Sequence, residues 1–292
     1  MTVAILGCGY IGLELARQLQ SDHDVVGVRR SESGIEAVEA TGASGVRADV
    51  TDDEALSAVP DAEWVVFAAS SGGRAAAAAR EVYVDGLRTA IDHFCARESP
   101  PERFVYTSST GVYGDHDGDW VDEETPIDPT TEKTEVLAEA ERLAVARPGE
   151  DTDGTVARFA GLYGPDRYRL SRYVEGPVTE GSLNMVHRAD AAGSVRHLLE
   201  SDSARGQVVN VVDDEPVSKW AFADWLAEQC GEPSPPKRTK AERLESDDLS
   251  AAAKRRIETS KRVSNDRLRA LGYEFEYPTF REGYRAAVES YK

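Results

Sequence analysis

Three glycines near the start of the chain have the spacing of a phosphate-binding turn. Gly7, Gly9 and Gly12 follow an apolar segment at residues 2–6 and precede a helical pattern at residues 13–20. In such a turn the first glycine permits the sharp bend, the second lets the backbone approach a diphosphate, and the third lets the helix pack closely on the strand. The N–H groups at the start of the helix then face the phosphates. The sequence therefore predicts a dinucleotide-binding turn; the alternative is a glycine turn without a ligand.

The next apolar segment, at residues 24–28, ends in two arginines rather than an acid. A protein that binds NAD(H) usually has Asp or Glu at this place, where the carboxylate bonds the ribose 2′-hydroxyl. The guanidinium groups of Arg29 and Arg30 can instead bind a 2′-phosphate, which a carboxylate would repel. Arg29 can also stack on adenine, and the Ser31 hydroxyl can donate a further hydrogen bond. We therefore expect NADP(H) as the preferred cofactor, and NAD(H) remains possible if Arg30 is only a solvated surface residue.

The carboxyl ends of later apolar segments should line the rest of the cofactor site, because ligands of parallel sheets bind there. Asp49 and Val50 follow the third segment and are expected near adenine. Residues 68–70 follow the fourth segment and are expected along the path to the second ribose. The complete set of predicted cofactor-binding residues is Gly7, Gly9, Tyr10, Ile11, Gly12, Arg29, Arg30, Ser31, Asp49, Val50, Ala68, Ala69, Ser70 and Thr107.

Apolar segments alternate with helical patterns over the first half of the chain. Strands are predicted at residues 2–6, 24–28, 46–49, 64–69, 103–107, 155–159 and 207–212, and helices at residues 13–20, 34–40, 53–58, 74–96, 136–146 and 218–228. This alternation is typical of a parallel, doubly wound sheet. We expect an α/β Rossmann domain at residues 1–165 and a small C-terminal substrate-binding lobe at residues 166–292, partly interleaved with it. The charged segment 240–261 is predicted to be a surface helix or a mobile segment.

The composition limits the partners and the location of the chain. With 53 Asp and Glu against 34 Lys and Arg, the net charge is −19, so the chain should bind neither nucleic acid nor an anionic membrane. No apolar run approaches the roughly 20 residues that span a bilayer, and no signal peptide is evident, which predicts a cytoplasmic protein. The dispersed acids suggest a halophilic protein in a high-salt cytoplasm; the alternative is an ordinary acidic protein. Cys8, Cys95 and Cys230 are far apart, which predicts neither disulfides nor a metal site.

Several segments together resemble one family. GCGYIG, YTSSTGVYG, RFAGLYGP, VHRADAA, VVNVVDDEPV and LGYEFEYPTFREGY occur in order along the chain. They resemble the extended short-chain dehydrogenases/reductases, which include NAD(P)-dependent epimerases and dehydratases, and the resemblance runs from residue 1 to about residue 285. It implies that Ser109, after the fifth strand, polarises a substrate carbonyl or hydroxyl. In this family a tyrosine and a lysine in the pattern YxxxK then transfer the proton, because an unassisted phenol is a poor base at neutral pH.

The chain departs from the family at that dyad. No YxxxK occurs between residues 115 and 160. An alignment on Glu141 puts Lys133 where the family has tyrosine and Leu137 where it has lysine, so the chain resembles an atypical subgroup that lacks the dyad. Ser109, Tyr113 and Lys133 form the candidate catalytic set. The alternative is that Tyr113 packs in the interior and Lys133 is a solvated residue in a helix first turn.

The predicted substrate-binding residues lie in the later family motifs. They are Arg158, Tyr163 and His187, with Arg188 and Asp190 beside them. The alternative for His187 is a structural role, in which the ring makes a hydrogen bond within the protein. A local basic cluster, residues 167–172, contains Arg167, Tyr168, Arg169 and Arg172. Such a cluster would suit a phosphorylated or carboxylated substrate. The alternative is that these arginines only balance the negative charge of the surface.

Two functions from different classes fit these observations. The first is an NADP(H)-dependent oxidoreductase, or a related epimerase or dehydratase, acting on a sugar or another small hydroxyl or carbonyl compound. The second is a catalytically inactive sensor or scaffold that binds NADP(H) and signals through a partner. The missing YxxxK favours the second, whereas the glycine turn and Ser109 favour the first. Family members often dimerise through two helices, here at residues 74–96 and 136–146, so a homodimer is expected.

Overall fold

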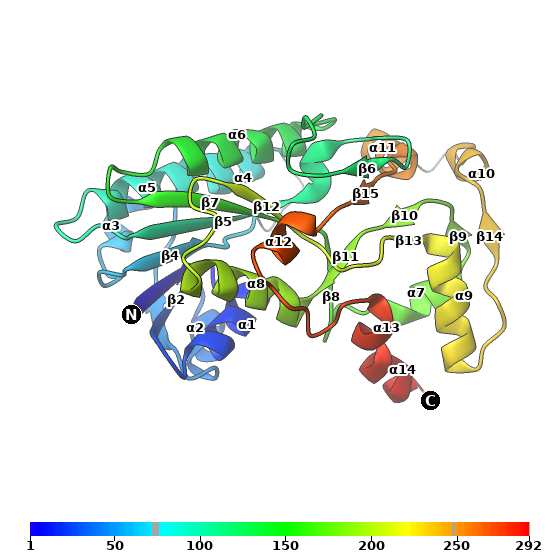
Figure 1. The fold of residues 1–292 in the computed structure, drawn as a ribbon, viewed down its shortest axis with the longest axis horizontal. Coiled ribbons are helices and arrows are strands. Elements are labelled where there is room, and N and C mark those ends of the chain that lie inside the picture. Colours follow the sequence, from blue (N-terminus) through cyan, green and yellow to red (C-terminus); the bar gives the residue numbers. More distant parts are fainter. Residues whose placement is uncertain (72–75, 247–248, 292) are drawn as a thin grey trace.

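The computed structural model describes residues 1–71, 76–246 and 249–291. Its centre is a sheet of seven parallel strands in the order β12-β7-β5-β4-β1-β2-β3. These strands are β1 (Thr2–Leu6), β2 (Asp24–Arg29), β3 (Ser44–Arg47), β4 (Trp64–Phe67), β5 (Arg103–Ser109), β7 (Asp153–Phe159) and β12 (Val208–Val211). The strand order reverses between β1 and β4, where such sheets leave a crevice for a ligand. The predicted α/β doubly wound Rossmann fold is therefore confirmed (Figure 1).

Helices cover both faces of this sheet (Figure 1). One face is covered by α1 (Tyr10–Leu19), α2 (Glu32–Glu39) and α8 (Arg188–Glu200). The other is covered by α3 (Asp53–Leu56), α4 (Ala76–Arg80), a π-helical turn η1 (Glu81–Gly86), α5 (Leu87–Cys95) and α6 (Glu132–Ala146). In the part of the chain that the structure describes, no helix is both long and apolar enough to cross a membrane.

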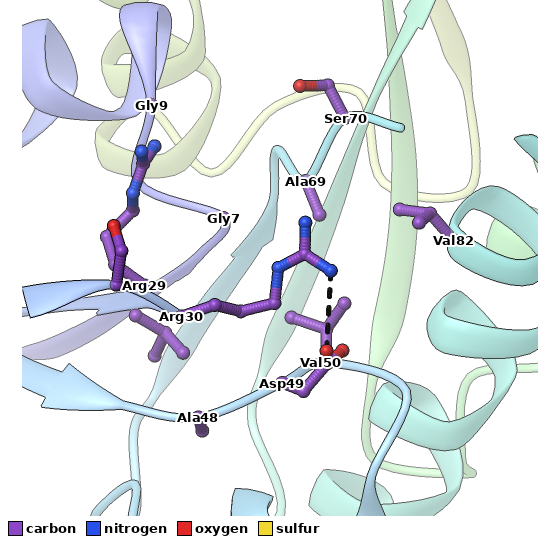
Figure 2. Close-up of a pocket in the computed structure, with 12 residues that line it drawn as sticks. Gly7, Gly9, Arg29, Arg30, Ala48, Asp49, Val50, Ala69, Ser70 and Val82 are labelled. Atoms are coloured by element: carbon purple, nitrogen blue, oxygen red, sulfur yellow. Dashed lines mark hydrogen bonds and ion pairs between the residues drawn. The ribbon is translucent and has the colours of Figure 1, made fainter. Parts of the chain in front are cut away.

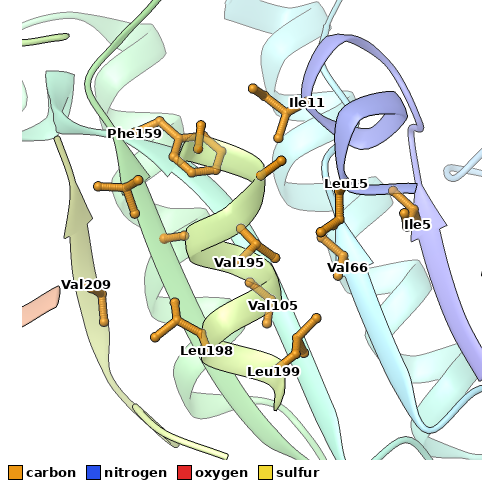
Figure 3. Packing of buried hydrophobic residues seen from close by; sticks show 14 of the residues in the cluster. Ile5, Ile11, Leu15, Val66, Val105, Phe159, Val195, Leu198, Leu199 and Val209 are labelled. Atoms are coloured by element: carbon orange, nitrogen blue, oxygen red, sulfur yellow. The ribbon is translucent and has the colours of Figure 1, made fainter. Parts of the chain in front are cut away.

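The side chains of the strands alternate between two cores, because successive residues of a strand point to opposite faces. In β1, Val3 and Ile5 pack in the core beneath α1 and α8, whereas Ala4 and Leu6 pack in the core beneath α5 and α6. Figure 3 shows the first core, into which α8 inserts Val195. Burial on both faces holds the strands in register and so fixes the positions of the residues at their carboxyl ends.

A smaller lobe lies beside the carboxyl ends of the strands (Figure 1). Its elements are β8 (Gly161–Tyr163), α7 (Leu170–Glu175), β9 (Val178–Thr179), β10 (Ser182–Leu183), β11 (Met185–His187), β13 (Val217–Ser218), α9 (Lys219–Cys230), β14 (Lys237–Arg238), α10 (Lys240–Leu244), α13 (Phe280–Gly283) and α14 (Arg285–Tyr291). Phe222, whose ring centroid is 5.1 Å from those of both Phe280 and Tyr284, lies in its aromatic core. Residues after 165 also supply β12 to the main sheet and α8 to the helical layer on one of its faces. The division of the chain at residue 165 remains a prediction.

Some predicted elements differ in extent from the observed ones. Helix α6 begins at Glu132 rather than at residue 136, because Thr131 caps it by accepting a hydrogen bond from the Thr134 N–H. The predicted helix 74–96 is described from Ala76 onward and contains the π-helical turn η1; residues 74–75 lie outside the described residues. The charged segment 240–261 holds two short helices, α10 and α11 (Ala251–Glu258), and its residues 247–248 are likewise outside the described part.

Candidate functional site

A pocket of about 460 Å³ lies at the carboxyl ends of β1, β2, β3 and β4 (Figure 2). Its position is the switch point of the sheet, where ligands of open α/β sheets bind. The lining residues are Gly7, Gly9, Val28, Arg29, Arg30, Ser31, Ala48, Asp49, Val50, Ala69, Ser70 and Val82. Nine of these twelve were predicted from the sequence as cofactor-binding residues, so the structure brings most of the predicted set together in one place.

The glycine turn has the close approaches that require glycine. Gly7 has φ of +80°, and a Cβ at this position would collide with the backbone of Ala69 on the neighbouring strand end. A Cβ on Gly12 would lie 3.0 Å from Cγ2 of Ile5, which is the close packing of helix on strand that the third glycine permits. Gly9 caps α1 without a side chain, so no side chain blocks the first N–H groups of the helix from a phosphate.

Cys8, inside this turn, is a packing residue. Its side chain is fully buried, with Sγ close to the positions that a Cβ would take on Gly12 and Gly27, at 3.4 and 3.0 Å. Burial raises the pKa of the thiol to about 12, although the nearby Arg29 charge lowers it. The thiol is therefore protonated at neutral pH and is not a nucleophile.

Two guanidinium groups stand beside the glycine turn. Nη1 of Arg29 donates to the carbonyl of Cys8 at 3.2 Å, which holds this side chain against the turn. Arg30 extends over the pocket toward Asp49, with 3.4 Å between Nη1 and Oδ2 (Figure 2). The Ser31 hydroxyl caps α2 by accepting from the N–H of Gly34 at 3.2 Å. The end of β2 therefore presents two cations and a hydroxyl to the pocket.

Asp49 is the one carboxylate that lines this part of the described structure. Burial raises its pKa, but hydrogen bonds from the N–H and hydroxyl of Thr51 and the charge of Arg30 outweigh it, so the pKa lies below its usual value. Asp49 is thus an anion at neutral pH. Its pair with Arg30 is long and exposed on both sides, and such pairs contribute little to stability.

Five predicted cofactor-binding residues do not line the pocket. They are Tyr10, Ile11, Gly12, Ala68 and Thr107. The side chains of Ile11 and Ala68 pack on the core beneath α1, and the Thr107 hydroxyl donates to the carbonyl of Phe67 at 3.3 Å. The sequence did not predict Val28, Ala48 and Val82 as lining residues. Val82 comes from η1, and a helical pattern in the sequence does not show which of its residues reach a pocket.

Ser109 ends β5 with its side chain half-buried. Its Oγ accepts a hydrogen bond from the N–H of Gly111 at 3.1 Å, which starts the 3-10 turn η2 (Thr110–Tyr113). No described residue accepts the Ser109 hydroxyl proton, so this proton is available to a ligand. Ser108, by contrast, is buried and donates to Glu141 at 2.6 Å.

Tyr113 and Arg158 do not face a cleft, which corrects both predictions. Tyr113 is fully buried; its hydroxyl donates to Oδ1 of Asn210 at 3.0 Å and accepts from Nη1 of Arg158 at 2.8 Å. Arg158 is also buried and pairs with Glu141. Burial raises the pKa of Tyr113 despite the Arg158 charge, so the hydroxyl stays protonated at neutral pH. Tyr113 therefore packs in the interior, which was the alternative to its catalytic role.

Lys133 lies in the first turn of α6, exposed, and its Nζ is 5.8 Å from the ring centroid of Tyr83 on η1. The structure thus places Lys133 beside a different tyrosine from the one predicted. The Tyr83 hydroxyl accepts a hydrogen bond from the N–H of Ser71, just beyond β4, at 3.3 Å. Leu137 and Glu141 follow Lys133 by one and two turns on the same face of α6, and both are buried. This face of α6 therefore has no lysine at the place of the family lysine.

Tyr163 and His187 lie in the interior of the lobe, and their predicted contact with substrate is wrong. The Tyr163 ring stacks on Tyr284 with centroids 4.9 Å apart, and a Cβ on Gly283 would collide with it. His187 caps α8, with Nδ1 accepting from the N–H of Ala189 at 3.3 Å. Burial, with the charge of Arg188, lowers the pKa of His187 to about 4, so the ring is neutral. The structure therefore gives His187 the structural hydrogen-bonding role that was its alternative.

Asp190 ties the last part of the chain to α8. The buried carboxylate accepts from the N–H groups of Glu276 and Tyr277 at 2.8 and 2.9 Å and from the Tyr273 hydroxyl at 3.0 Å. These bonds hold the segment before α13 against the Rossmann layer. Asp190 therefore supports the lobe rather than contacting a ligand.

The loop before α7 connects the lobe to the glycine turn. The guanidinium of Arg167 lies 3.9 Å from the ring centroid of Tyr10, and that of Arg188 lies 5.1 Å from it. The Tyr10 hydroxyl donates to the carbonyl of Pro165 at 2.9 Å. Asp166 and Arg169 in this loop have φ of +65° and +51°, which non-glycine residues adopt at a cost. Tyr10 therefore joins the two parts of the site rather than lining the pocket.

Comparisons with known proteins agree with this geometry. Residues 3–208 match the model of the NAD dependent epimerase/dehydratase family. Protein YeeZ of Escherichia coli (strain K12) is 30% identical over 285 residues, covering 94% of this chain and 96% of that protein. A functionally unknown conserved protein from Silicibacter pomeroyi has a solved structure with 30% identity and a TM-score of 0.78, covering 99% of this chain and 98% of that one. Human epimerase family protein SDR39U1, solved with NADPH, is 18% identical with a TM-score of 0.79, covers 99% of each chain, and shows the fold alone.

Proposed function

Since the chain belongs to the NAD dependent epimerase/dehydratase family, we propose that it is an NADP(H)-binding oxidoreductase or epimerase-like enzyme. It acts on a sugar or another small hydroxyl or carbonyl compound in the cytoplasm. The observation that carries the proposal is the pair Arg29 and Arg30, which line the pocket beside the glycine turn. Members of the family bind NAD(P), and the residues of this pocket fit such a cofactor.

The preference for NADP(H) is supported by the charges at the end of β2. A 2′-phosphate at this place would meet Arg29, Arg30 and the hydroxyl of Ser31. Arginine therefore stands at the end of β2, where an NAD(H)-binding protein usually has Asp or Glu to bond the 2′-hydroxyl. Arg30 has only a long, exposed contact with Asp49, so a phosphate can replace that partner at little cost. Charge-assisted hydrogen bonds to phosphate are the strong kind, and two guanidinium groups can supply several.

The bound cofactor would supply the hydride acceptor or donor, and the chain would orient the substrate. We assign to Ser109 the role of donating its free hydroxyl proton to the substrate oxygen, because its Oγ is already fixed by the Gly111 N–H. Leu137 occupies the place of the family lysine and Tyr113 is buried, so the family dyad is not rebuilt from these residues.

The substrate is proposed to carry a phosphate or carboxylate group. Arg167, Arg169 and Arg172 lie on one loop and the helix that follows it, and within the described residues none of them forms an ion pair with a carboxylate. Three cations without a carboxylate partner on one short segment would suit an anionic ligand. A homodimer through α5 and α6 also remains a prediction.

The proposal is tested by following NADPH oxidation with a panel of phosphorylated and neutral aldehydes and ketones. Turnover that falls strongly in Ser109→Ala, but not in the exposed control Ser57→Ala, supports the enzyme and the role of Ser109. Cofactor binding with no turnover of any panel member supports the sensor or scaffold alternative instead. Equal turnover by Ser109→Ala contradicts the role given to Ser109.

A further inference from the structure

Tyr83, on the π-helical turn η1, holds a fixed hydroxyl at the carboxyl end of β4. The residue is 8% exposed, and its ring packs in the core beneath α5 and α6. The hydroxyl oxygen accepts hydrogen bonds from Ser71, from the N–H at 3.3 Å and from Oγ at 3.5 Å. No described residue accepts the hydroxyl proton of Tyr83. The oxygen is therefore held in place while the proton stays available to a ligand.

The π-helical turn brings this hydroxyl to the cofactor pocket. Val82 precedes Tyr83 and lines the pocket, as does Ser70, which precedes Ser71 (Figure 2). The turn interrupts the helix between α4 and α5. Such single π-helical turns are rare and occur frequently at functional sites. Tyr83 and its partner Ser71 are thus each one residue away from the lining of the pocket.

Ser109 lies at the carboxyl end of the neighbouring strand. Strands β4 and β5 pair in parallel, with Phe67 opposite Tyr106, so the residues that follow them lie at the same edge of the sheet. Like Tyr83, Ser109 has an oxygen fixed by a backbone N–H and a proton that no described residue accepts. Two hydroxyls of this kind at adjacent strand ends are suited to bind and protonate one substrate oxygen.

The start of α6 connects Ser109 with Tyr83. The position that a Cβ would take on Gly111 lies 3.4 Å from Oγ of Ser109 and 3.7 Å from Cγ2 of Thr134. Lys133 precedes Thr134, and its Nζ lies 5.8 Å from the ring centroid of Tyr83. A positive charge at this place would stabilise the phenolate that remains after Tyr83 gives up its proton.

We propose that Tyr83 is the catalytic acid of this chain, in place of the tyrosine that the family has on α6, and that Lys133 stabilises its phenolate. This inference rests on the proposed function and deepens it. The reduced nicotinamide supplies a hydride to the carbonyl carbon of the substrate. The C=O π pair moves to the oxygen, which Ser109 holds by a hydrogen bond. The Tyr83 O–H bond breaks, its proton passes to that oxygen, and the phenolate then takes up a proton from solvent.

The test compares two tyrosine variants of the full chain by NADPH oxidation with glyceraldehyde, glyceraldehyde 3-phosphate and the other carbonyl compounds of the panel. Tyr83→Phe removes the proposed acid and should lower turnover about 100-fold or more. Tyr106→Phe is the matched control, because Tyr106 is fully buried on β5 and its hydroxyl has no partner among the described residues. This control should leave turnover unchanged.

A second pair of variants tests the cation. Lys133→Gln removes an exposed positive charge and should lower turnover about tenfold. Arg142→Gln removes an exposed positive charge further along the same helix and should leave turnover unchanged. Because Lys133 is exposed, this pair decides the inference if Tyr83→Phe does not fold. Equal turnover in the two charge variants would then overturn it.

NADPH affinity, measured by nicotinamide fluorescence, separates a catalytic role of Tyr83 from a structural one. A fall in turnover in Tyr83→Phe but not in Tyr106→Phe, with unchanged NADPH affinity, supports the inference. Full turnover by Tyr83→Phe overturns it and leaves the proposed function standing. A fall in turnover that only follows a loss of NADPH affinity shows a structural role and also overturns it. If the natural chain binds NADPH but reduces no panel member, the inference and the proposed enzyme both fail.

Discussion

Arg158 and Glu141 form an ion pair inside the protein, with 2.7 Å between Nη2 and Oε2 and 6% and 5% of their side chains exposed. The pair links β7 to α6, and Arg158 also donates to the Tyr113 hydroxyl while Ser108 donates to Glu141. All four groups are therefore satisfied by one another. A buried charge left without its partner costs far more than a broken surface pair.

Removal of one partner tests this network. Arg158→Met leaves the Glu141 carboxylate buried without its cation, and we expect a loss of about 3–5 kcal/mol in the free energy of unfolding. Arg147 and Asp92 make an exposed pair at 2.7 Å, so Arg147→Met should cost no more than about 1 kcal/mol. Urea unfolding of both variants makes the comparison. Similar losses in the two variants would show that the Arg158 pair is solvated.

Gly7 offers a second test, of the backbone in the glycine turn. Gly7→Ala must adopt φ of +80° and relieve a collision with Ala69, so we expect a destabilisation above the cost of about 1–2 kcal/mol for the left-handed backbone alone, together with loss of cofactor binding. Gly206→Ala is the matched control, since Gly206 has φ of +67° but open space around its Cβ position. Thermal unfolding and calorimetry give the two quantities. If Gly7→Ala matches Gly206→Ala in both stability and cofactor binding, the collision with Ala69 is not what requires glycine at this position.

The neutral state of His187 predicts a dependence of stability on pH. Its folded pKa of about 4 lies below the ordinary value of 6.5, so the unfolded chain takes up the proton first as pH falls. The contribution of His187 is fully present above pH 6.5 and is lost between pH 6.5 and 4, on the order of 2–3 kcal/mol. His187→Asn keeps an acceptor for the Ala189 N–H and does not titrate.

The measurement is the free energy of unfolding in urea at several pH values across that window. The loss between pH 6.5 and 4 should be smaller in His187→Asn than in the natural chain. Comparison of the two chains is needed because burial raises the pKa of the Asp190 and Asp213 carboxyl groups, which shifts stability in the opposite direction. Identical pH profiles would show that His187 is as accessible to protons in the folded chain as in the unfolded one.

The acidic surface predicts a response to salt. If the chain is adapted to a high-salt cytoplasm, its melting temperature should rise as KCl increases toward molar concentration, because screening reduces the repulsion within a net charge of −19. Thermal unfolding in a KCl series measures it, with sucrose at matched osmolarity as the control. A melting temperature that falls steadily with KCl would contradict the adaptation, and an unchanged one would indicate an ordinary acidic protein.

The pocket at the ends of β1, β2, β3 and β4 could be predicted from the sequence because the residues that form it are mostly local. The glycine turn, Arg29, Arg30 and Ser31 lie within the first 31 residues. The alternation of strands and helices predicts a parallel sheet, so the carboxyl ends of these strands lie at the same edge. The positions of Tyr113 and His187 could not be predicted in this way. Each is covered by residues distant in the sequence, Asn210 for Tyr113 and Tyr277 for His187, whose ring centroids are 3.9 Å apart.

The same limit applies to the cations of the lobe. The sequence showed Arg167, Arg169 and Arg172 as a cluster because they are neighbours in the chain. Lys219 and Lys240, the first residues of α9 and α10, are far from this cluster in the sequence and are placed beside residues 180–181 by tertiary hydrogen bonds to Gly181 and Glu180. The π-helical turn that carries Val82 and Tyr83 was also hidden, because its composition reads as an ordinary helix.

The most direct test of the central claim is the affinity of the chain for NADPH and NADH, measured by nicotinamide fluorescence at one fixed KCl concentration. We expect NADPH to bind more tightly than NADH. We also expect Arg30→Gln to weaken NADPH binding about 10- to 100-fold, the equivalent of lost charge-assisted hydrogen bonds, with little effect on NADH. Arg142→Gln, the control, removes one exposed positive charge on α6 and should change neither value. Equal or tighter binding of NADH by the natural chain would contradict the assignment of Arg29 and Arg30 to a 2′-phosphate.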